Sequence, residues 1–321
     1  MRFISTFLFF IGFLMLGIPV FAQRYGNHYA GKHFKKDKEL TAQLHQFLEE
    51  RNFKGDVGIY VYNLKDRREA AIHADTIFPT ASIIKVPILI NIFQKIVDKK
   101  LTYHQSLMYR DSIARGGSGL LQYFKDSTKL DLSKIVRLMI THSDNTAAVW
   151  CQQLAGGGTS INQWLANHDY KFTRVNSHTE GREEAYNKYG WGQTTPREMA
   201  NLLIAIRKKY ILTSAACERM YRDMTGVYWD DYALSQIPPY VQAASKQGMV
   251  NASRSELVMV NAPHGDYVFY IATKNNKDQR WVPDNDAWQL ARDVSKLLWN
   301  YYEPKSEWKM PKEAALYWDW N

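Results

Sequence analysis

Residues 78–89 read FPTASIIKVPIL, and this stretch decides how the chain is interpreted. From Ser82 onward, apolar residues fall on every face of a helix, a pattern typical of a helix buried on all sides. Lys85 interrupts the apolar run three residues after Ser82, so both side chains lie on the same face of that helix. Burial lowers the pKa of a lysine, which could then accept the proton of a serine hydroxyl. The alternative is a structural lysine with a buried stem and an ammonium group that reaches solvent.

Two shorter motifs follow. Residues 141–147 read THSDNTA, and residues 245–250 read SKQGMV at the end of a predicted strand. Taken separately, the first is typical of a turn or helix cap and the second of a strand end. Together, S-x-x-K, S-D-N and K-x-G form the motif set of penicillin-recognising serine enzymes. The sequence therefore resembles the class A β-lactamases over roughly residues 40–300, with spacings of 61 residues from Ser82 to Ser143 and 103 from Ser143 to Lys246.

The resemblance implies an acyl-enzyme mechanism, which needs a nucleophile, a proton acceptor, a leaving-group acid and an oxyanion hole. Ser82 would be the nucleophile and Lys85 its base. Ser143 would relay a proton to the departing nitrogen, and Lys246 would tune that relay electrostatically. Substrate contacts are implied for Asn145, Gln247, Gly248, Met249 and Arg254.

Two of these contacts depend on the backbone. The N–H groups of Ser82 and Met249 would form the oxyanion hole. Gly248 lacks a side chain, so an extended substrate could pair with the strand edge beside it. Asn145 would hydrogen-bond the side-chain amide of the substrate and the lysine.

The sequence departs from the family pattern at two places. Gln247 replaces the usual Thr or Ser of the third motif, whose hydroxyl normally helps to hold the substrate carboxylate. Arg254 could supply a bidentate carboxylate contact instead, or it could be a surface charge on a strand.

The second departure concerns the glutamate that activates water against the acyl-enzyme. Glu183 fits the pattern E-x-x-Y-N with Asn187 and is the favoured candidate, whereas Glu180 fits better by its distance to Pro196. Glu184 is a third candidate. The remaining alternative is that all three are solvated loop charges.

The order of elements predicts an α/β (α+β) fold: a mixed, mainly antiparallel sheet flanked by terminal helices, with an inserted all-helical domain, as in β-lactamases and D-alanyl transpeptidases. Strands are expected at 57–64, 69–75, 240–248, 255–262 and 266–275. Helices are expected at 38–51, from near 82, over much of 102–226, and at 284–302. Loops are expected at 115–119, 155–158 and 174–195. The expected domains are a signal peptide (1–22), a lead-in (23–37), an α/β domain (38–101 with 227–303), the inserted domain (102–226) and a C-terminal tail (304–321).

The N-terminal stretch indicates export. An arginine, a long apolar run and small residues at Val20 and Ala22 suit signal-peptidase cleavage, which we favour over an uncleaved anchor. We therefore expect a secreted or periplasmic location, with no integral membrane domain after cleavage. The two cysteines, Cys151 and Cys217, are expected to be buried free thiols.

Composition narrows the classes of ligand. The net charge is +9, but the basic residues are scattered, so nucleic acid is not an expected partner. The nine histidines form no metal-ligand spacing, and neither a metal nor a cofactor is expected. A monomer is expected.

The prediction is thus an exported serine hydrolase of the class A β-lactamase type that acts on a β-lactam amide through a Ser82 acyl-enzyme. The alternatives are a D-alanyl peptidase or another amidase or esterase of the same fold, and a penicillin-binding sensor without efficient turnover. The expected partner is a small β-lactam or a D-alanyl peptide.

Overall fold

The computed structural model describes residues 34–318, and its centre is a six-stranded sheet in the order β1-β3-β2-β11-β10-β9. The strands are β1 (Lys35–Lys36), β2 (Asp56–Asn63), β3 (Arg68–Ile72), β9 (Ala243–Val250), β10 (Ser253–Val260) and β11 (Tyr267–Lys274). All neighbouring pairs are antiparallel except β1 with β3. The predicted fold class is therefore confirmed. The predicted signal peptide and most of the lead-in fall outside the described residues.

Both faces of the sheet are buried. Successive side chains of a strand point to opposite faces, so each strand contributes residues to both apolar cores. In β2, Ile59 and Val61 belong to one apolar core, whereas Tyr60 and Tyr62 belong to the other. Because both faces of β2 are covered by apolar residues, its sequence VGIYVY (57–62) is a nearly continuous apolar run instead of an alternating one.

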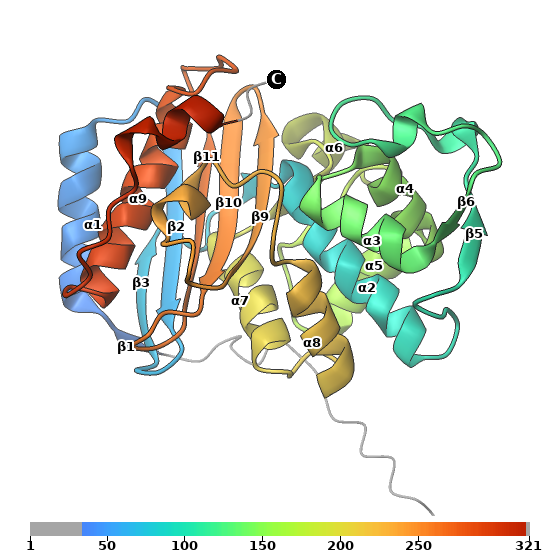
Figure 1. Ribbon diagram of the computed structural model, residues 1–321, viewed down its shortest axis with the longest axis horizontal. Coiled ribbons are helices and arrows are strands. Elements are labelled where there is room, and N and C mark those ends of the chain that lie inside the picture. Colours follow the sequence, from blue (N-terminus) through green and yellow to red (C-terminus); the bar gives the residue numbers. More distant parts are fainter. Residues whose placement is uncertain (1–33, 319–321) are drawn as a thin grey trace, which may run out of the picture.

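Helices cover each face of the sheet (Figure 1). The first and last long helices, α1 (Lys38–Arg51) and α9 (Asp286–Tyr302), pack side by side on one face. The other helices are α2 (Lys85–Val97), α3 (Leu132–Thr141), α4 (Asn145–Leu154), α5 (Gly157–Asn167), α6 (Glu183–Tyr189), α7 (Pro196–Arg207) and α8 (Ser214–Asp223). Core residues of α2, α3, α4, α7 and α8 share one apolar cluster with the opposite face of the sheet.

Three local predictions need correction. The buried helix begins as a 3₁₀ turn, η1 (Ala81–Ile84), and becomes α-helical only at Lys85. Residues 157 and 158 are helical and not part of a loop, because Gly156 (φ 101°) turns the chain and α5 begins directly after it. A side chain at Gly158 would collide with Thr179 (1.7 Å to Oγ1), so glycine there permits close packing.

The stretch 174–195 is also more ordered than a loop. It contains β7 (Arg174–Val175), α6 and β8 (Gly192–Thr194), and β4 (Phe78–Pro79), β8 and β7 form a small sheet beside Ser82. A second small sheet joins β5 (Ser106–Met108) to β6 (Lys129–Asp131). The short 3₁₀ helices are η2 (Asp111–Ile113), η3 (Leu121–Tyr123), η4 (Ala233–Gln236) and η5 (Lys312–Tyr317), the last within the C-terminal tail.

Between residues 34 and 318, none of the helices combines the length and apolar character needed to cross a bilayer. Both cysteines are buried and unpaired, as predicted.

Candidate active site

Ser82 is held by a strained turn between β4 and α2. The preceding residue, Ala81, has a left-handed backbone (φ 43°), which is unfavourable for a residue with a side chain and tends to occur at functional sites. The Ile83 N–H donates to the Thr80 carbonyl (2.9 Å) and closes the turn. The serine is thereby fixed at the N-terminal entrance of the buried helix.

Lys85 reaches back from the first turn of α2 to this serine. Its Nζ lies 2.9 Å from Ser82 Oγ and is fully buried. It also donates to Asn145 Oδ1 (2.9 Å), Ser143 Oγ (3.1 Å) and the Ser143 carbonyl. Burial, reinforced by the neighbouring charge of Lys246 and opposed by Asp144, holds the pKa of Lys85 well below its ordinary value. The neutral amine needed for a general base is therefore favoured.

Ser143 lies between the two buried lysines. Lys246, from β9, places its Nζ 3.0 Å from Ser143 Oγ and 2.8 Å from the Gln247 carbonyl. Burial lowers the pKa of Lys246 to about 7, although the charge of Glu256 acts in the opposite direction. Ser82, Lys85, Ser143 and Lys246 thus form one continuous hydrogen-bonded chain, which is the arrangement a proton relay requires.

Asp144, next to Ser143, holds the segments beside this chain in place, a role beyond the helix cap that the sequence pattern offered. Its carboxylate accepts from the Ala147 N–H and so caps α4, and it also accepts from the N–H groups of Leu120 (2.7 Å) and Leu121 (2.8 Å). A side chain at Gly119 would collide with it at 2.3 Å. The S-D-N motif therefore also clamps the glycine-rich segment 116–119 over the site. An aspartate directly before a predicted helix was the available signal.

Gly248 has a packing role that differs from the predicted one. A Cβ at this position would lie 2.3 Å from the Thr80 carbonyl oxygen and 3.0 Å from the Ile83 backbone nitrogen. The missing side chain therefore lets β9, the edge strand of the large sheet, lie directly against the turn that carries Ser82. Met249 follows at once and lines the same two cavities as Ser82.

Ser82 lies where two cavities meet. We call the first, of about 810 Å³, the aromatic arm, because its walls include Tyr123, Tyr228, Trp229, Tyr232, Trp281 and Trp288. We call the second, of about 600 Å³, the lysine arm, because its walls include Lys188, Tyr189, Trp191 and Lys274. Ser82, Asn145 and Met249 line both arms, so a substrate in either arm meets the nucleophile.

The two residues predicted to bind a carboxylate are largely occupied by the protein itself. Gln247 lines the aromatic arm, and its Nε2 donates to the Trp229 carbonyl (3.1 Å). Arg254 is 2% exposed, and its guanidinium lies 4.5 Å from the ring centroid of Trp281 and 5.8 Å from that of Trp288. Arg254 therefore lies behind the aromatic wall instead of in the cavity.

The three candidate glutamates lie on a different surface. Glu180 and Glu183 line a separate cavity with Asn187, and Glu183 and Glu184 are exposed in the first turn of α6. Towards Lys85 the loop instead presents Trp191, whose ring centroid is 5.8 Å from Lys85 Nζ. Among the described residues, neither arm that contains Ser82 is lined by a carboxylate.

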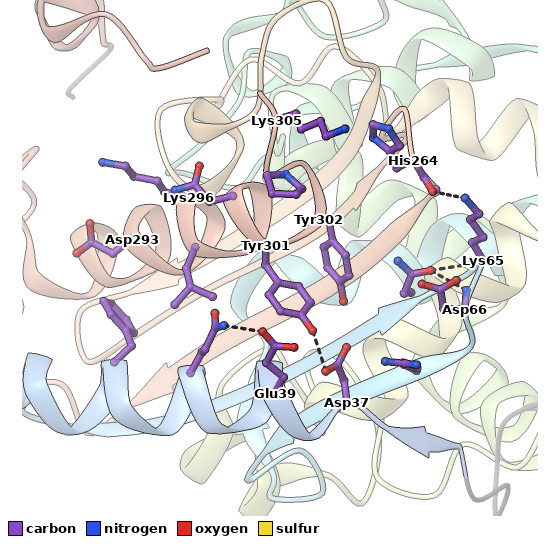
Figure 2. A pocket seen from close by; sticks show the side chains of 18 residues that line it. Asp37, Glu39, Lys65, Asp66, His264, Asp293, Lys296, Tyr301, Tyr302 and Lys305 are labelled. Carbon is purple, nitrogen blue, oxygen red and sulfur yellow. Dashed lines mark hydrogen bonds between the residues drawn. The ribbon is translucent and has the colours of Figure 1, made fainter. Parts of the chain in front are cut away.

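Another cavity, of about 1080 Å³ and so larger than either arm, lies away from Ser82 and is lined by residues that include members of α1 and α9 (Figure 2). Its polar groups bond to one another: Tyr301 donates to Asp37 (3.0 Å), Gln43 to Glu39 (3.5 Å) and Lys65 to the His264 carbonyl (3.0 Å). Asp37 also caps α1. These contacts are structural, and we place the active site at Ser82.

The fold, together with a serine at the start of a buried helix and two buried lysines beside it, has the arrangement predicted from the β-lactamase motifs. The β-lactamase enzyme family model matches residues 39–302, so the chain belongs to this family. A curated relative, β-lactamase VEB-1 of Pseudomonas aeruginosa, is 22% identical over 275 residues, or 82% of this chain and 90% of that protein.

Solved structures give the same fold. PBP-A is 25% identical with a TM-score of 0.74, covering 84% of this chain and 98% of its own, and a PBP-A mutant is known as an acyl-enzyme complex with penicillin G. A β-lactamase from Chitinophaga pinensis is 18% identical with a TM-score of 0.73, covering 81% of this chain and 99% of its own.

Proposed function

We propose that this protein is a serine hydrolase of the β-lactamase type, acylated on Ser82 by a β-lactam or a related amide or ester. The observation that carries the proposal is the contact of 2.9 Å between Ser82 Oγ and the fully buried Nζ of Lys85. Burial lowers the pKa of this amine, which favours the neutral form that can accept the serine proton as the hydroxyl attacks.

The remaining steps use the other members of the chain. The attacking oxygen bonds to the acyl carbon, and the backbone N–H groups of Ser82 and Met249 stabilise the negative oxygen that forms. One such donor commonly lowers the activation barrier by about 3 kcal/mol. Ser143 then gives its proton to the leaving nitrogen or oxygen. Lys85, which has taken the proton of Ser82, then returns a proton to Ser143 through their hydrogen bond.

A second candidate function is a penicillin-binding protein that is acylated but releases product slowly. The observation that favours it is the position of Glu180, Glu183 and Glu184, which are exposed on a surface separate from both arms. An acyl ester is stable without a base at hydrogen-bond distance from the attacking water. The relationship to PBP-A is compatible with this candidate, and that to VEB-1 with an efficient hydrolase.

One experiment separates these candidates. The protein is mixed with a penicillin, and its intact mass is followed over time for wild type and Ser82→Ala. We expect an adduct on wild type and none on Ser82→Ala, and an equal adduct on the mutant would overturn the nucleophile assignment. An adduct that persists for hours identifies the penicillin-binding candidate, whereas rapid loss identifies a β-lactamase.

The glutamates are tested in the same way. If wild type releases the adduct, Glu183→Gln should trap it while Glu180→Gln and Glu184→Gln release it normally. A trap in Glu180→Gln or Glu184→Gln alone would move the role to that residue. Rapid release in all three mutants would remove these glutamates from the mechanism.

The same proposal includes export of the chain to the periplasm or the medium through residues 1–22. N-terminal sequencing of the protein from fractionated cells tests it, and a mature chain that begins at Gln23 is the expected result. Retention of Met1 on a cytoplasmic protein would contradict export.

A further inference from the structure

The position of Ser143 assigns a direction to the two arms. Ser143 lines the aromatic arm and is absent from the described residues that line the lysine arm. Its hydroxyl is the group placed to protonate the departing atom, so the leaving group must lie on that side of the scissile bond. The acyl group, which stays on Ser82, then lies toward the lysine arm.

The lysine arm is cationic. Lys274 Nζ donates to the Ile77 carbonyl (2.9 Å), and Lys188 Nζ lies 5.3 Å from the ring centroid of Tyr189. Neither contact supplies a negative charge, and the described residues that line this arm include no carboxylate. An anionic group in this arm would therefore lie beside two lysines that have no carboxylate partner within the arm.

The aromatic arm has the opposite character. No Lys, Arg, Asp or Glu is among the described residues that line it. Its rings pack on one another, with Tyr228 edge-on to Trp229 (5.1 Å) and Tyr232 stacked on Trp288 (3.7 Å). Trp281 and Tyr228 remain 52% and 47% exposed, so they offer ring faces to a ligand. Flat groups pack favourably on such faces.

The nearest guanidinium is shielded from this arm. Arg254 lies under Trp281 and Trp288, and its side chain donates to the backbone carbonyls of Asn251, Ser253 and Arg280. Gln247, at the position where a hydroxyl would help to hold a carboxylate, is bonded to the Trp229 carbonyl. His142 also lines this arm and stacks on Tyr228 (5.2 Å), and Lys246, which contacts Ser143, is fully buried. A carboxylate on the leaving group would therefore enter a mainly aromatic cavity in which no lysine or arginine is among the described lining residues, which is costly.

We propose that the native substrate of Ser82 carries an anionic acyl group and an uncharged leaving group with a flat ring. This inference rests on the proposed function and specifies its substrate class. In the reaction, Ser82 Oγ bonds to the acyl carbon and the bond from that carbon to the leaving oxygen or nitrogen breaks. The leaving atom takes its proton from Ser143, and water later cleaves the Ser82 ester.

Four activated esters test the assignment as a two-by-two set. The acyl group is butanoyl or succinyl, and the leaving group is 4-nitrophenol or 3-carboxy-4-nitrophenol. The value of kcat/KM is measured for each ester with the rate of Ser82→Ala subtracted. We expect the succinyl 4-nitrophenyl ester to be fastest, by about tenfold over each ester that differs from it in one charge. The succinyl preference should shrink in about 0.5 M salt.

Charge-removing variants test the lysine arm. The double variant Lys188→Gln with Lys274→Gln should lose most of the preference for succinyl over butanoyl, measured as the ratio of the two kcat/KM values within the same variant. Lys100→Gln removes one exposed charge outside both arms and is the matched control, with the wild-type preference expected. A double variant that keeps the full preference would overturn the cationic role of this arm.

Removing the Trp281 ring that covers Arg254 tests the aromatic arm. Trp281→Ala should expose Arg254 and raise the relative kcat/KM of the 3-carboxy-4-nitrophenyl esters about tenfold, and Trp281→Phe should not. Combining Trp281→Ala with Arg254→Met should abolish the gain. Trp281→Ala with no gain would overturn the shielding.

The failures of the two proposals are distinguishable. Equal rates for all four esters, with hydrolysis still dependent on Ser82, would overturn this inference and leave the proposed function standing. Absence of any Ser82-dependent acylation, by these esters or by penicillin, would overturn both.

Discussion

At the scale of single residues, the S-x-x-K pattern has its predicted geometry, and Lys85 is the residue whose chemistry depends most on burial. We expect Lys85→Ala to slow acylation of Ser82 about a hundredfold to ten-thousandfold, the usual range for loss of a general base. Stopped-flow labelling with a fluorescent penicillin measures the acylation rate. Asn91→Ala, which removes another buried polar side chain of α2, is the control for general damage to the helix. A rate within a factor of two of wild type would make Lys85 structural.

Lys246 should give the reaction an alkaline limit. Its pKa is about 7, so the ammonium group beside Ser143 is present below this pH and is lost as the pH rises through it. Lys85, Glu256 and Gln247 are the other polar groups that influence Lys246 or contact it directly. With an uncharged ester as substrate, acylation should fall by up to about tenfold between pH ~6 and pH ~8.5, because the charge that favours proton donation by Ser143 disappears.

Lys246→Gln provides the comparison. This variant should be slower at every pH and should lack the decline between pH ~6 and pH ~8.5. Its circular dichroism spectrum should match that of wild type, which excludes misfolding as the cause. A decline that persists in Lys246→Gln would assign the titration to another group.

At the scale of elements, the contact between β9 and η1 fixes the geometry of the nucleophile. Gly248→Ala adds a Cβ that would lie 2.3 Å from the Thr80 carbonyl, so the strand must move away from the Ser82 turn. We expect a loss of about 1–3 kcal/mol in the free energy of unfolding, and a slower acylation rate because the N–H groups of Ser82 and Met249 separate. Urea unfolding and penicillin labelling measure the two effects. In the matched control, Gly116→Ala, the added methyl would meet only Gln122 Oε1 at 3.9 Å, and wild-type stability is expected.

The elements also show where sequence reasoning succeeds. The helix at 38–51 matches α1 because it has a capping Asp37 and a regular apolar stripe, and β11 lies within one residue of its predicted range because it is a run of β-branched and aromatic residues. β9 and β10 are shifted by two or three residues from their predicted ranges, because they contain fewer such residues. The stretch 174–195 was misjudged because its order comes from side-chain hydrogen bonds between residues of the stretch that are six to eleven positions apart. Arg182, for example, donates to Asn176 (2.8 Å) and to Gln193 (2.7 Å), and no local pattern encodes those bonds.

The site residues also fall into two groups, those that the sequence predicted and those that it did not. The motif residues could be found from the chain because their spacing within one helix or one strand end is local. Trp191 beside Lys85 and the shielding of Arg254 by Trp281 could not, because each depends on how separate loops close over the sheet. For the same reason, the sequence offered Glu183 as a base without indicating that α6 presents it to solvent.

At the scale of the whole molecule, the predicted α/β domain and inserted helical domain share an apolar core, and Arg197 joins them. From α7 it pairs with Glu69 of β3 (2.6 Å) and with Asp75 (2.8 Å), and its guanidinium lies 4.7 Å from the ring centroid of Tyr60 in β2. Glu69 is nearly buried, so Arg197→Met leaves a carboxylate poorly solvated. The expected loss of stability is about 2 kcal/mol, below the roughly 3–5 kcal/mol typical of a fully buried pair, because Arg197 remains partly exposed.

Urea unfolding followed by tryptophan fluorescence and by far-ultraviolet circular dichroism should give one coincident transition, shifted equally for both probes in the variant. Arg110→Met, which removes an exposed pair with Asp126, should leave the urea midpoint unchanged. Two separate transitions, with only one of them shifted by Arg197→Met, would instead mean that the sheet and the helices unfold as independent domains.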